Sequence, residues 1–394
     1  MTTQLDTIIP PASIEATFHT DEKDLAMTTI DDTTPHFHDA ARALLATMSP
    51  ERQKRAERRG RKHARYVTMP KDKMIAESLD ALCENAAAAL FGQAGKRRAL
   101  FLLGESDSGK TRAMEYHIPK RQEFRPYVTA AGEEFRPFVS FEAPRPITLK
   151  GFARKALAAC GYPIATNKLT EQELFELLKQ VIRNNRILFM YVDEMQHVLK
   201  GTTTKEIQNV SDIIKSLLQI PGWPLHMIFS GVPSLARFLS PEDGDTQLRN
   251  RSIVVELKQM TRKDAKALLT LQQQVMAGDG VAVEETGTVE FMARLIHACN
   301  GACGTIIQTM QEAAERAMTD HLAQVALPDG NDTVPMVMIK HYADVYALNT
   351  GCRYSDNVFL QDDWEKIEPR HSLGIVLSKA TPTGKPDKFK KKEG

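Results

Sequence analysis

The feature that most constrains the fold is a glycine-bracketed loop after an apolar run, residues 99–103. The loop has the pattern G-x-x-x-x-G-K-[ST], which is filled by Gly104, Glu105, Ser106, Asp107, Ser108, Gly109, Lys110 and Thr111. In this pattern the glycines let backbone N–H groups turn toward a phosphate, and Lys110 brings a positive charge to its oxygens. The Thr111 hydroxyl can bind Mg²⁺, and a helix beginning near Gly109 points its positive end at the same anion. The stretch therefore predicts a nucleotide site between a buried strand and a helix.

A second apolar run, residues 187–192, ends in two acids, Asp193 and Glu194. A fully apolar strand is typical of the centre of a parallel sheet, and ligands bind at the carboxyl ends of such strands. We expect Asp193 to share the Mg²⁺ with Thr111, and Glu194 to polarise the attacking water. The alternative is a pair of acids that begins a surface loop, and the upstream phosphate-binding pattern disfavours it.

Two later features carry polar groups with more than one interpretation. The apolar strand at residues 225–229 ends in Ser230, whose hydroxyl can bridge the γ-phosphate and the water or can cap the strand. Arg249 and Arg251 come just before the β-rich residues 252–257. These arginines can reach a phosphate on a neighbouring subunit, or they can form ion pairs on the surface of their own chain.

The chain is long enough for two folded units with tails, because 394 residues exceed the usual size of one domain. Its 42% hydrophobic and 26% charged residues are ordinary for a soluble protein. Composition and periodicity predict a disordered acidic leader at 1–35, a helical basic N-terminal region at 36–95, a nucleotide-binding core at 96–260, a helical lid at 261–348 and a flexible basic tail at 349–394.

The location that we expect is the cytoplasm. The five cysteines are odd in number and scattered, which disfavours a disulfide framework and indicates a reducing compartment. The first residues lack the basic and apolar regions of a signal peptide, and no apolar run is long enough to span a bilayer. We therefore expect no membrane partner.

A strongly basic stretch at residues 52–65 follows the helix-start signal Ser49-Pro50-Glu51. It is basic on every face and lacks the apolar stripe of a core helix. It can contact the phosphates of nucleic acid or dock on an acidic partner, or it can be a solvated linker helix. Farther along, residues 124–137 predict a hairpin that turns near Gly132, and Thr170 with Glu173 predicts a capping box.

The order of these features resembles that of the AAA+ ATPases. Four details narrow the resemblance to transposition regulators of the TniB/TnsC type. The loop Gly-Glu-Ser-Asp-Ser-Gly-Lys-Thr is similar to their Walker A motif, and residues 192–199, Val-Asp-Glu-Met-Gln-His-Val-Leu, are similar to their Walker B motif with its following helix. The hairpin, and residues 301–304 entering a lid helix, also resemble that family. The resemblance spans about residues 65–320 and implies an α/β fold, a P-loop AAA+ core with a parallel sheet followed by an all-helical lid subdomain.

The same resemblance implies an ATPase that uses ATP and Mg²⁺, with hydrolysis as an assembly switch. Lys110, Asp193 and Glu194 would be catalytic, Ser230 would be the sensor 1 residue, and Arg249 or Arg251 would be a finger that acts in trans. The implied partners are double-stranded DNA, a DDE transposase subunit, and further copies of the chain in a ring or helical filament. The positions that would face DNA, or would otherwise form a solvated charged surface, are Arg125, Arg136, Lys150, Arg154 and Lys155.

Two positions depart from the family pattern. Residue 107 is Asp where many relatives have a small residue, and the lid entry has no arginine at the usual sensor 2 place. The charge missing from the lid can come from the next subunit. Two rival functions share most of these motifs: an initiator or helicase loader of the AAA+ type in replication or repair, and a nucleotide-binding scaffold that does not turn over.

Overall fold

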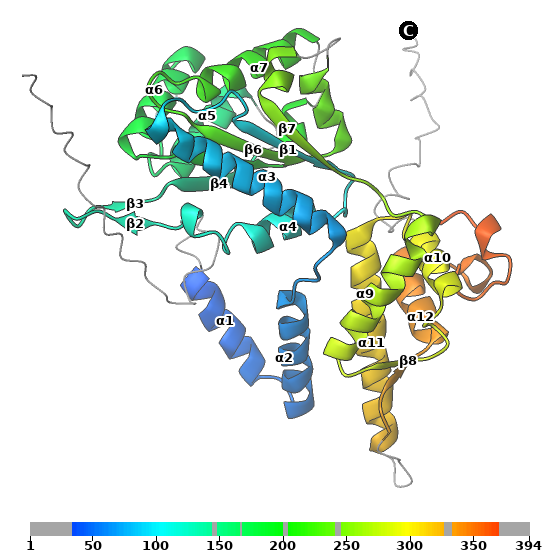
Figure 1. Ribbon diagram of the computed structural model, residues 1–394. Coiled ribbons are helices and arrows are strands. Elements are labelled where there is room, and N and C mark those ends of the chain that lie inside the picture. The colour runs from blue at the N-terminus through cyan, green and yellow to red at the C-terminus, as the bar shows by residue number, and fades with distance from the viewer. Residues whose placement is uncertain are drawn as a thin grey trace, which may run out of the picture. The chain divides into compact units, whose positions relative to one another are not determined.

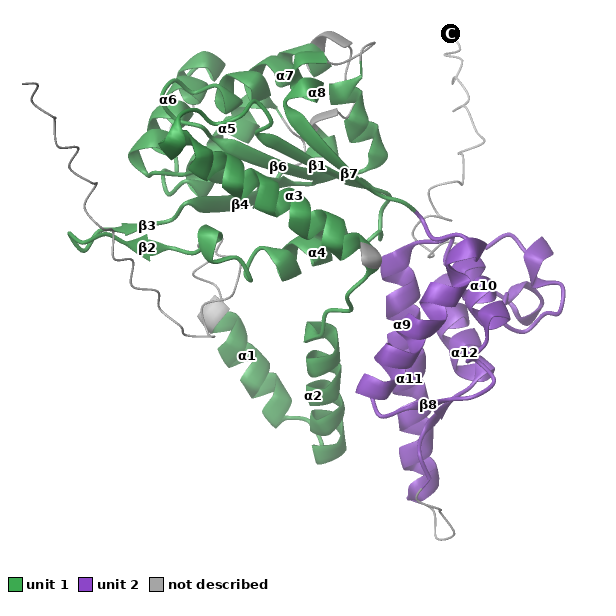
Figure 2. Ribbon diagram, in the orientation of Figure 1, with its two compact units in different colours: residues 1–258 green, residues 259–394 purple. Residues whose placement is uncertain are grey.

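The computed structural model describes residues 34–143, 148–165, 168–199, 204–240, 246–326 and 333–369. The chain divides into two compact units, Met1–Lys258 and Gln259–Gly394 (Figure 2). This division lies close to the boundary after residue 260 that the sequence predicts. The expected acidic leader lies outside the described residues up to residue 33.

The centre of unit 1 is a five-stranded parallel sheet with the strand order β4-β5-β6-β1-β7 (Figure 1). Its strands are β1 (Ala99–Gly104), β4 (Phe138–Glu142), β5 (Phe189–Asp193), β6 (His226–Gly231) and β7 (Ser252–Leu257). Every residue of β1 and β6 is buried, which explains why these segments are continuous apolar runs. Because β6 lies between β1 and β5, its carboxyl end stands between the predicted phosphate loop and the two acids.

Helices cover both faces of this sheet, and alternate residues of β1 point to different layers. Leu100 and Leu102 pack with α3 (Pro70–Ala87) and α4 (Lys110–His117), whereas Phe101 and Leu103 belong to the core of the opposite face. That second face is covered by α5 (Leu149–Ala159), α6 (Glu171–Asn184) and α7 (Thr204–Leu218). The side-chain period of two along a strand thus produces a three-layer sandwich.

The N-terminal part of unit 1 contains two further helices, α1 (Thr34–Ala46) and α2 (Pro50–Ala64). Ser49 caps α2 as predicted, and its hydroxyl accepts the backbone N–H of Arg52 at 3.5 Å. No residue of α2 is buried, as expected for a helix that is basic on every face. The following helix α3 differs, because its apolar side chains pack against the sheet.

The predicted hairpin is present as β2 (Tyr127–Val128) paired antiparallel with β3 (Glu134–Phe135). The capping box at the start of α6 is also present, because the Thr170 hydroxyl accepts the N–H of Glu173 at 3.2 Å and the Glu173 carboxylate accepts the N–H of Thr170 at 2.7 Å. Short elements complete the unit: η2 (Ala88–Phe91), η3 (Gln122–Phe124), η4 (Met195–Leu199), η5 (Pro233–Leu239) and α8 (Thr246–Asn250).

Unit 2 is mainly helical, as predicted. Its longer helices are α9 (Ala265–Gly278), α10 (Val289–Ala298), α11 (Cys303–Val325) and α12 (Ile339–Thr350), preceded by η6 (Arg262–Asp264). The sequence missed a small parallel sheet of β8 (Ala282–Val283) and β9 (Met336–Val337), so the unit is not entirely helical. Among the described helices of the chain, we find none with the length and apolar content needed to span a bilayer.

The boundary predicted for the flexible tail, residue 349, lies too early in the chain. Residues 351–369 are described and include η7 (Tyr354–Asp356) and η8 (Trp364–Lys366). Phe359 is fully buried, with ring contacts to Phe291 and Tyr342, and Trp364 packs against His297. The segment has no helical period, but its aromatic side chains anchor it to unit 2. The rest of the expected tail, residues 370–394, lies outside the described residues.

Candidate functional site

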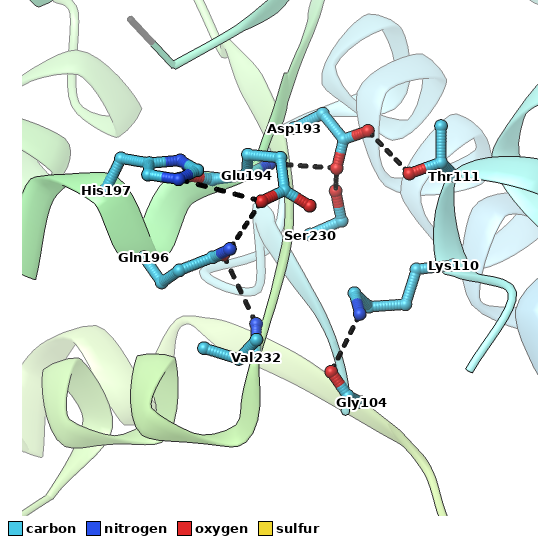
Figure 3. A network of polar contacts seen from close by, with 9 residues as sticks. All are labelled: Gly104, Lys110, Thr111, Asp193, Glu194, Gln196, His197, Ser230 and Val232. Carbon is cyan, nitrogen blue, oxygen red and sulfur yellow. Dashed lines mark hydrogen bonds and ion pairs between the residues drawn. The ribbon is translucent and has the colours of Figure 1, made fainter. Parts of the chain in front are cut away.

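The predicted phosphate loop connects β1 to α4 in a tightly curled conformation. Gly109 has a left-handed φ of 85°, which a residue without a side chain adopts at little cost. The Lys110 ammonium donates to the carbonyl oxygens of Gly104 at 2.7 Å and Glu105 at 2.8 Å, so it lies in the mouth of the loop (Figure 3). Burial lowers the pKa of Lys110, and the carboxylates of Glu194 and Asp193 act in the opposite direction. The positive charge therefore faces the acidic strand end.

Asp193 is the centre of the polar network at the carboxyl edge of the sheet. Its Oδ2 accepts a hydrogen bond from the Thr111 hydroxyl at 2.8 Å, and its Oδ1 accepts the N–H of Glu194 at 2.8 Å (Figure 3). Ser230 donates to the same Oδ1, and its hydroxyl also lies 2.9 Å from the Tyr191 hydroxyl. The structure thus brings together the two expected Mg²⁺ ligands and the serine.

Thr111 and Asp193 are suitable ligands for Mg²⁺. A hydroxyl and a carboxylate are hard oxygen donors, and Mg²⁺ is commonly bound by one or two such groups together with substrate phosphates. Their 2.8 Å separation places the two oxygens next to each other, and Thr111 directly follows Lys110 in the chain. A Mg–nucleotide complex therefore fits the donor set.

Glu194 lies beside this pair in an uncommon backbone conformation, with a φ of 56°. Non-glycine residues at positive φ are infrequent, and they cluster at functional sites. Two neighbours in the chain hold the residue. Gln196 donates to the Glu194 carboxylate at 2.6 Å, and His197 Nδ1 lies 2.7 Å from the Glu194 carbonyl oxygen. The sequence did not single out either neighbour.

The phosphate loop and the helix α4 that follows it also contact the segment that precedes β1 in the chain. Lys71, in the first turn of α3, donates to the Ser108 carbonyl at 2.6 Å. Arg112, in α4, donates to the carbonyl of His63 at the end of α2. Lys71 therefore connects the phosphate loop to α3, and Arg112 connects α4 to the basic helix α2; no motif indicated either contact.

A buried carboxylate supports the same region. Asp72 accepts hydrogen bonds from the Tyr66 hydroxyl at 2.5 Å and from the N–H of Met69 at 2.5 Å, and its other contact is His117 Nε2 at 2.9 Å. Burial raises the pKa of Asp72, but the hydrogen bonds from His117, Tyr66 and Met69 outweigh it, so the pKa lies below the ordinary value. The ionised carboxylate ties the linker, α3 and the far end of α4 together.

The two candidate finger arginines have different surroundings. Arg249 is exposed on α8, and no hydrogen bond or ion pair joins it to another described residue. Arg251 is half-buried, and both of its Nη atoms lie 2.5 Å from the Gln219 amide oxygen once that amide is correctly oriented. Its carbonyl also accepts the N–H of Ala99 at 3.1 Å. Arg251 is thus engaged within its own chain, whereas Arg249 is available to a partner.

The five candidate DNA-facing residues lie on two surfaces of unit 1. Lys150, Arg154 and Lys155 share α5, while Arg125 and Arg136 flank the hairpin. The Arg136 guanidinium pairs with a glutamate of β3 at 3.4 Å, so the hairpin carries compensating negative charge. On α5 the Lys150 ammonium donates to the Leu169 carbonyl at 3.2 Å and also interacts with the charge of Glu173.

The parallel sheet carries a phosphate loop, an acid pair and a polar strand end at one edge, and a mainly helical unit follows it in the chain. These features define a P-loop protein of the AAA+ ATPase class. The family model described as TniB, Bacterial TniB protein, matches residues 59–262, just over half of the chain. The chain therefore belongs to the TniB family, as its sequence predicts.

Solved structures give weaker likenesses. CDC6P from Pyrobaculum aerophilum is 13% identical with a TM-score of 0.46, and the match covers 75% of this chain and 74% of that one. The ORC1 protein of Aeropyrum pernix, solved in complex with DNA, is 15% identical with a TM-score of 0.44, over 74% of this chain and 69% of that one. Values this low transfer no function. Among curated proteins, the sequence finds no match.

Proposed function

We propose that the protein is an ATP-dependent, DNA-binding regulator of DNA transposition. In this proposal it assembles on target DNA with ATP bound, recruits a DDE transposase, and disassembles after hydrolysis. The observation that carries the ATPase part is the hydrogen-bonded set of Thr111, Asp193 and Ser230 beside Lys110. Membership of the TniB family supports the role in transposition.

The residues of the site divide the chemistry as follows. Backbone N–H groups of the loop and the Lys110 ammonium bind the β- and γ-phosphates. Thr111 and Asp193 would hold a Mg²⁺ ion, which would neutralise charge on the phosphate oxygens. Glu194 orients the water and accepts its proton as the oxygen bonds to the γ-phosphorus. The bond to the β-phosphate oxygen breaks at the same time, and ADP leaves with the electron pair.

Hydrolysis is tested by Mg²⁺-dependent phosphate release, measured without and with duplex DNA. We expect slow turnover alone and faster turnover with DNA. Glu194→Gln should bind ATP and lose turnover, because the amide cannot accept the proton. Glu256→Gln is the matched control, since this exposed glutamate lies in β7 of the same sheet. Turnover of Glu194→Gln at the level of the unaltered protein would refute the assignment.

DNA binding is tested through its salt dependence. Each phosphate contact contributes about −0.9 to the log–log slope of affinity against salt. Replacing Lys150 and Arg154 by Ala should flatten this slope for all sequences alike. The control replaces Lys73 and Lys366 by Ala. Both side chains are exposed, so this control removes the same amount of positive charge at other positions of the chain. Affinity that is insensitive to salt would contradict the electrostatic interpretation.

The role in transposition is tested by recruitment. With ATP and duplex DNA present, the protein should retain a DDE transposase, and retention should be lost after hydrolysis. A helicase loader would instead retain a replicative helicase and would ignore the transposase. A scaffold without turnover would retain the transposase equally well at all times after ATP addition.

A further inference from the structure

The side chain of Gln196 connects the ends of two strands within the site. It lies in η4, immediately after β5, and its Nε2 donates to Glu194 Oε2 at 2.6 Å (Figure 3). Its Oε1 accepts the backbone N–H of Val232, just beyond β6, at 3.3 Å. The amide is therefore used at both ends, and exchanging its oxygen and nitrogen would remove both hydrogen bonds.

The neighbouring backbone leaves room for this amide. Gly231 has no side chain, and a Cβ at that position would lie 2.4 Å from Gln196 Oε1 and 3.2 Å from a methyl carbon of Leu235. Any other residue at 231 would displace the amide or the leucine. The glycine and the glutamine thus form a matched pair at the end of β6.

The hydrogen bonds of Gln196 complement a contact that already joins the same two strands. Ser230, at the end of β6, donates to Asp193, at the end of β5. Gln196 adds a second connection one step farther from the sheet, between Glu194 and Val232. The two connections hold the ends of β5 and β6 together, and the Gln196 amide restricts the Glu194 carboxylate together with the His197 ring, whose Nε2 lies 3.9 Å from Glu194 Oε2.

We infer that Gln196 is a positioning residue for hydrolysis, acting through Glu194. A neutral amide cannot accept the proton of the water, so its contribution is to hold the carboxylate in the orientation that the water requires. Misplacement of a reacting group by about 1 Å can cost on the order of 10²-fold in rate. The inference rests on the proposed ATPase function, because the orientation of the Glu194 carboxylate affects the rate only if this carboxylate activates water.

The first test replaces Gln196 by Met, which keeps the length of the side chain and removes both hydrogen bonds. We expect kcat for ATP to fall by about tenfold or more, with KM and the affinity for ADP changed less than twofold. A changed KM with an unchanged kcat would overturn the inference, and so would kinetics equal to those of the unaltered protein.

A double-mutant comparison separates positioning from a general structural role. If Gln196 acts through Glu194, Gln196→Met should not lower the residual turnover of Glu194→Gln any further, because effects of residues that act as a unit are not additive. An additional tenfold loss in the double variant would place Gln196 in an independent role and overturn the inference.

Gly231→Ala provides a second route that leaves the glutamine in place. The added methyl group should displace the amide and reproduce the loss in kcat, and combining it with Gln196→Met should add little. If Gln196→Met fails to fold, as judged by its melting temperature and ADP binding, Gly231→Ala carries the test, and unaltered kcat in this folded variant refutes the inference. Absence of turnover in the unaltered protein refutes the ATPase proposal, and this inference falls with it. Turnover that survives both substitutions refutes the inference alone.

Discussion

The contact between Lys71 and the phosphate loop predicts a specific loss of nucleotide affinity. Lys71 donates to the Ser108 carbonyl at 2.6 Å and reaches it from another helix. A hydrogen bond from a charged group contributes about 1.5–3 kcal/mol when shielded from water. Because Lys71 is only half-buried, water can replace part of the lost partner, and we expect about 1 kcal/mol from Lys71→Met. If that energy serves to hold the binding conformation of the loop, the Kd for ADP should rise roughly fivefold.

The assay is an equilibrium titration with Mg²⁺ and ADP, which separates binding from hydrolysis. Lys73→Met is the matched control: it removes the same charge from the same helix, but the Lys73 side chain is 83% exposed and only approaches Glu77 at 3.8 Å. We expect the control to change the Kd by less than twofold. Equal affinities of the two variants would show that the contact with Ser108 does not stabilise the binding conformation.

Two further predictions concern the finger arginines and the buried carboxylate. Mixing Glu194→Gln with Arg249→Ala subunits should restore part of the ATPase activity that each variant lacks alone. If confirmed mixed assemblies recover no activity, Arg249 is not the finger that acts in trans. Arg251→Ala should mainly lower the melting temperature. Asp72→Asn should cost about 2 kcal/mol of unfolding free energy at neutral pH. Because the pKa of Asp72 is lowered in the folded state, this stabilisation is present above the ordinary carboxyl pKa and is lost as the pH falls through the folded-state value. Denaturant titrations of both proteins should therefore converge in acid, and a constant difference would contradict this reasoning.

The residues proposed to bind nucleotide and Mg²⁺ could be predicted from the sequence, because phosphate and metal binding fix their local spacing. Lys110 and Thr111 follow a glycine at the start of a helix, and Asp193 ends a strand that must be apolar on both faces. The same logic predicted the sheet, the hairpin and most helices. It could not give the strand order, because the position of β6 between β1 and β5 depends on pairing between segments far apart in the chain.

The tail boundary was wrong for a related reason. Periodicity detects a face that is buried repeatedly, as in a helix or strand. The segment after residue 350 is buried at separate points, chiefly Phe359 and Trp364, and the chain between them follows no period. Such a segment has the sequence pattern of a loop, although its large aromatic side chains bury enough apolar surface to hold it in place.

The residues that position the site by binding backbone groups could not be identified from the sequence. Gln196 accepts a backbone N–H that is 36 residues away, and Lys71 donates to a backbone carbonyl that is 37 residues away. Every residue has a carbonyl and nearly every residue has an N–H, so neither partner is marked by a particular amino acid. Only the fold decides which backbone group lies within reach. A motif therefore identifies side chains that meet a ligand, whereas the side chains that hold those residues by binding backbone become visible only when the strands and helices are placed.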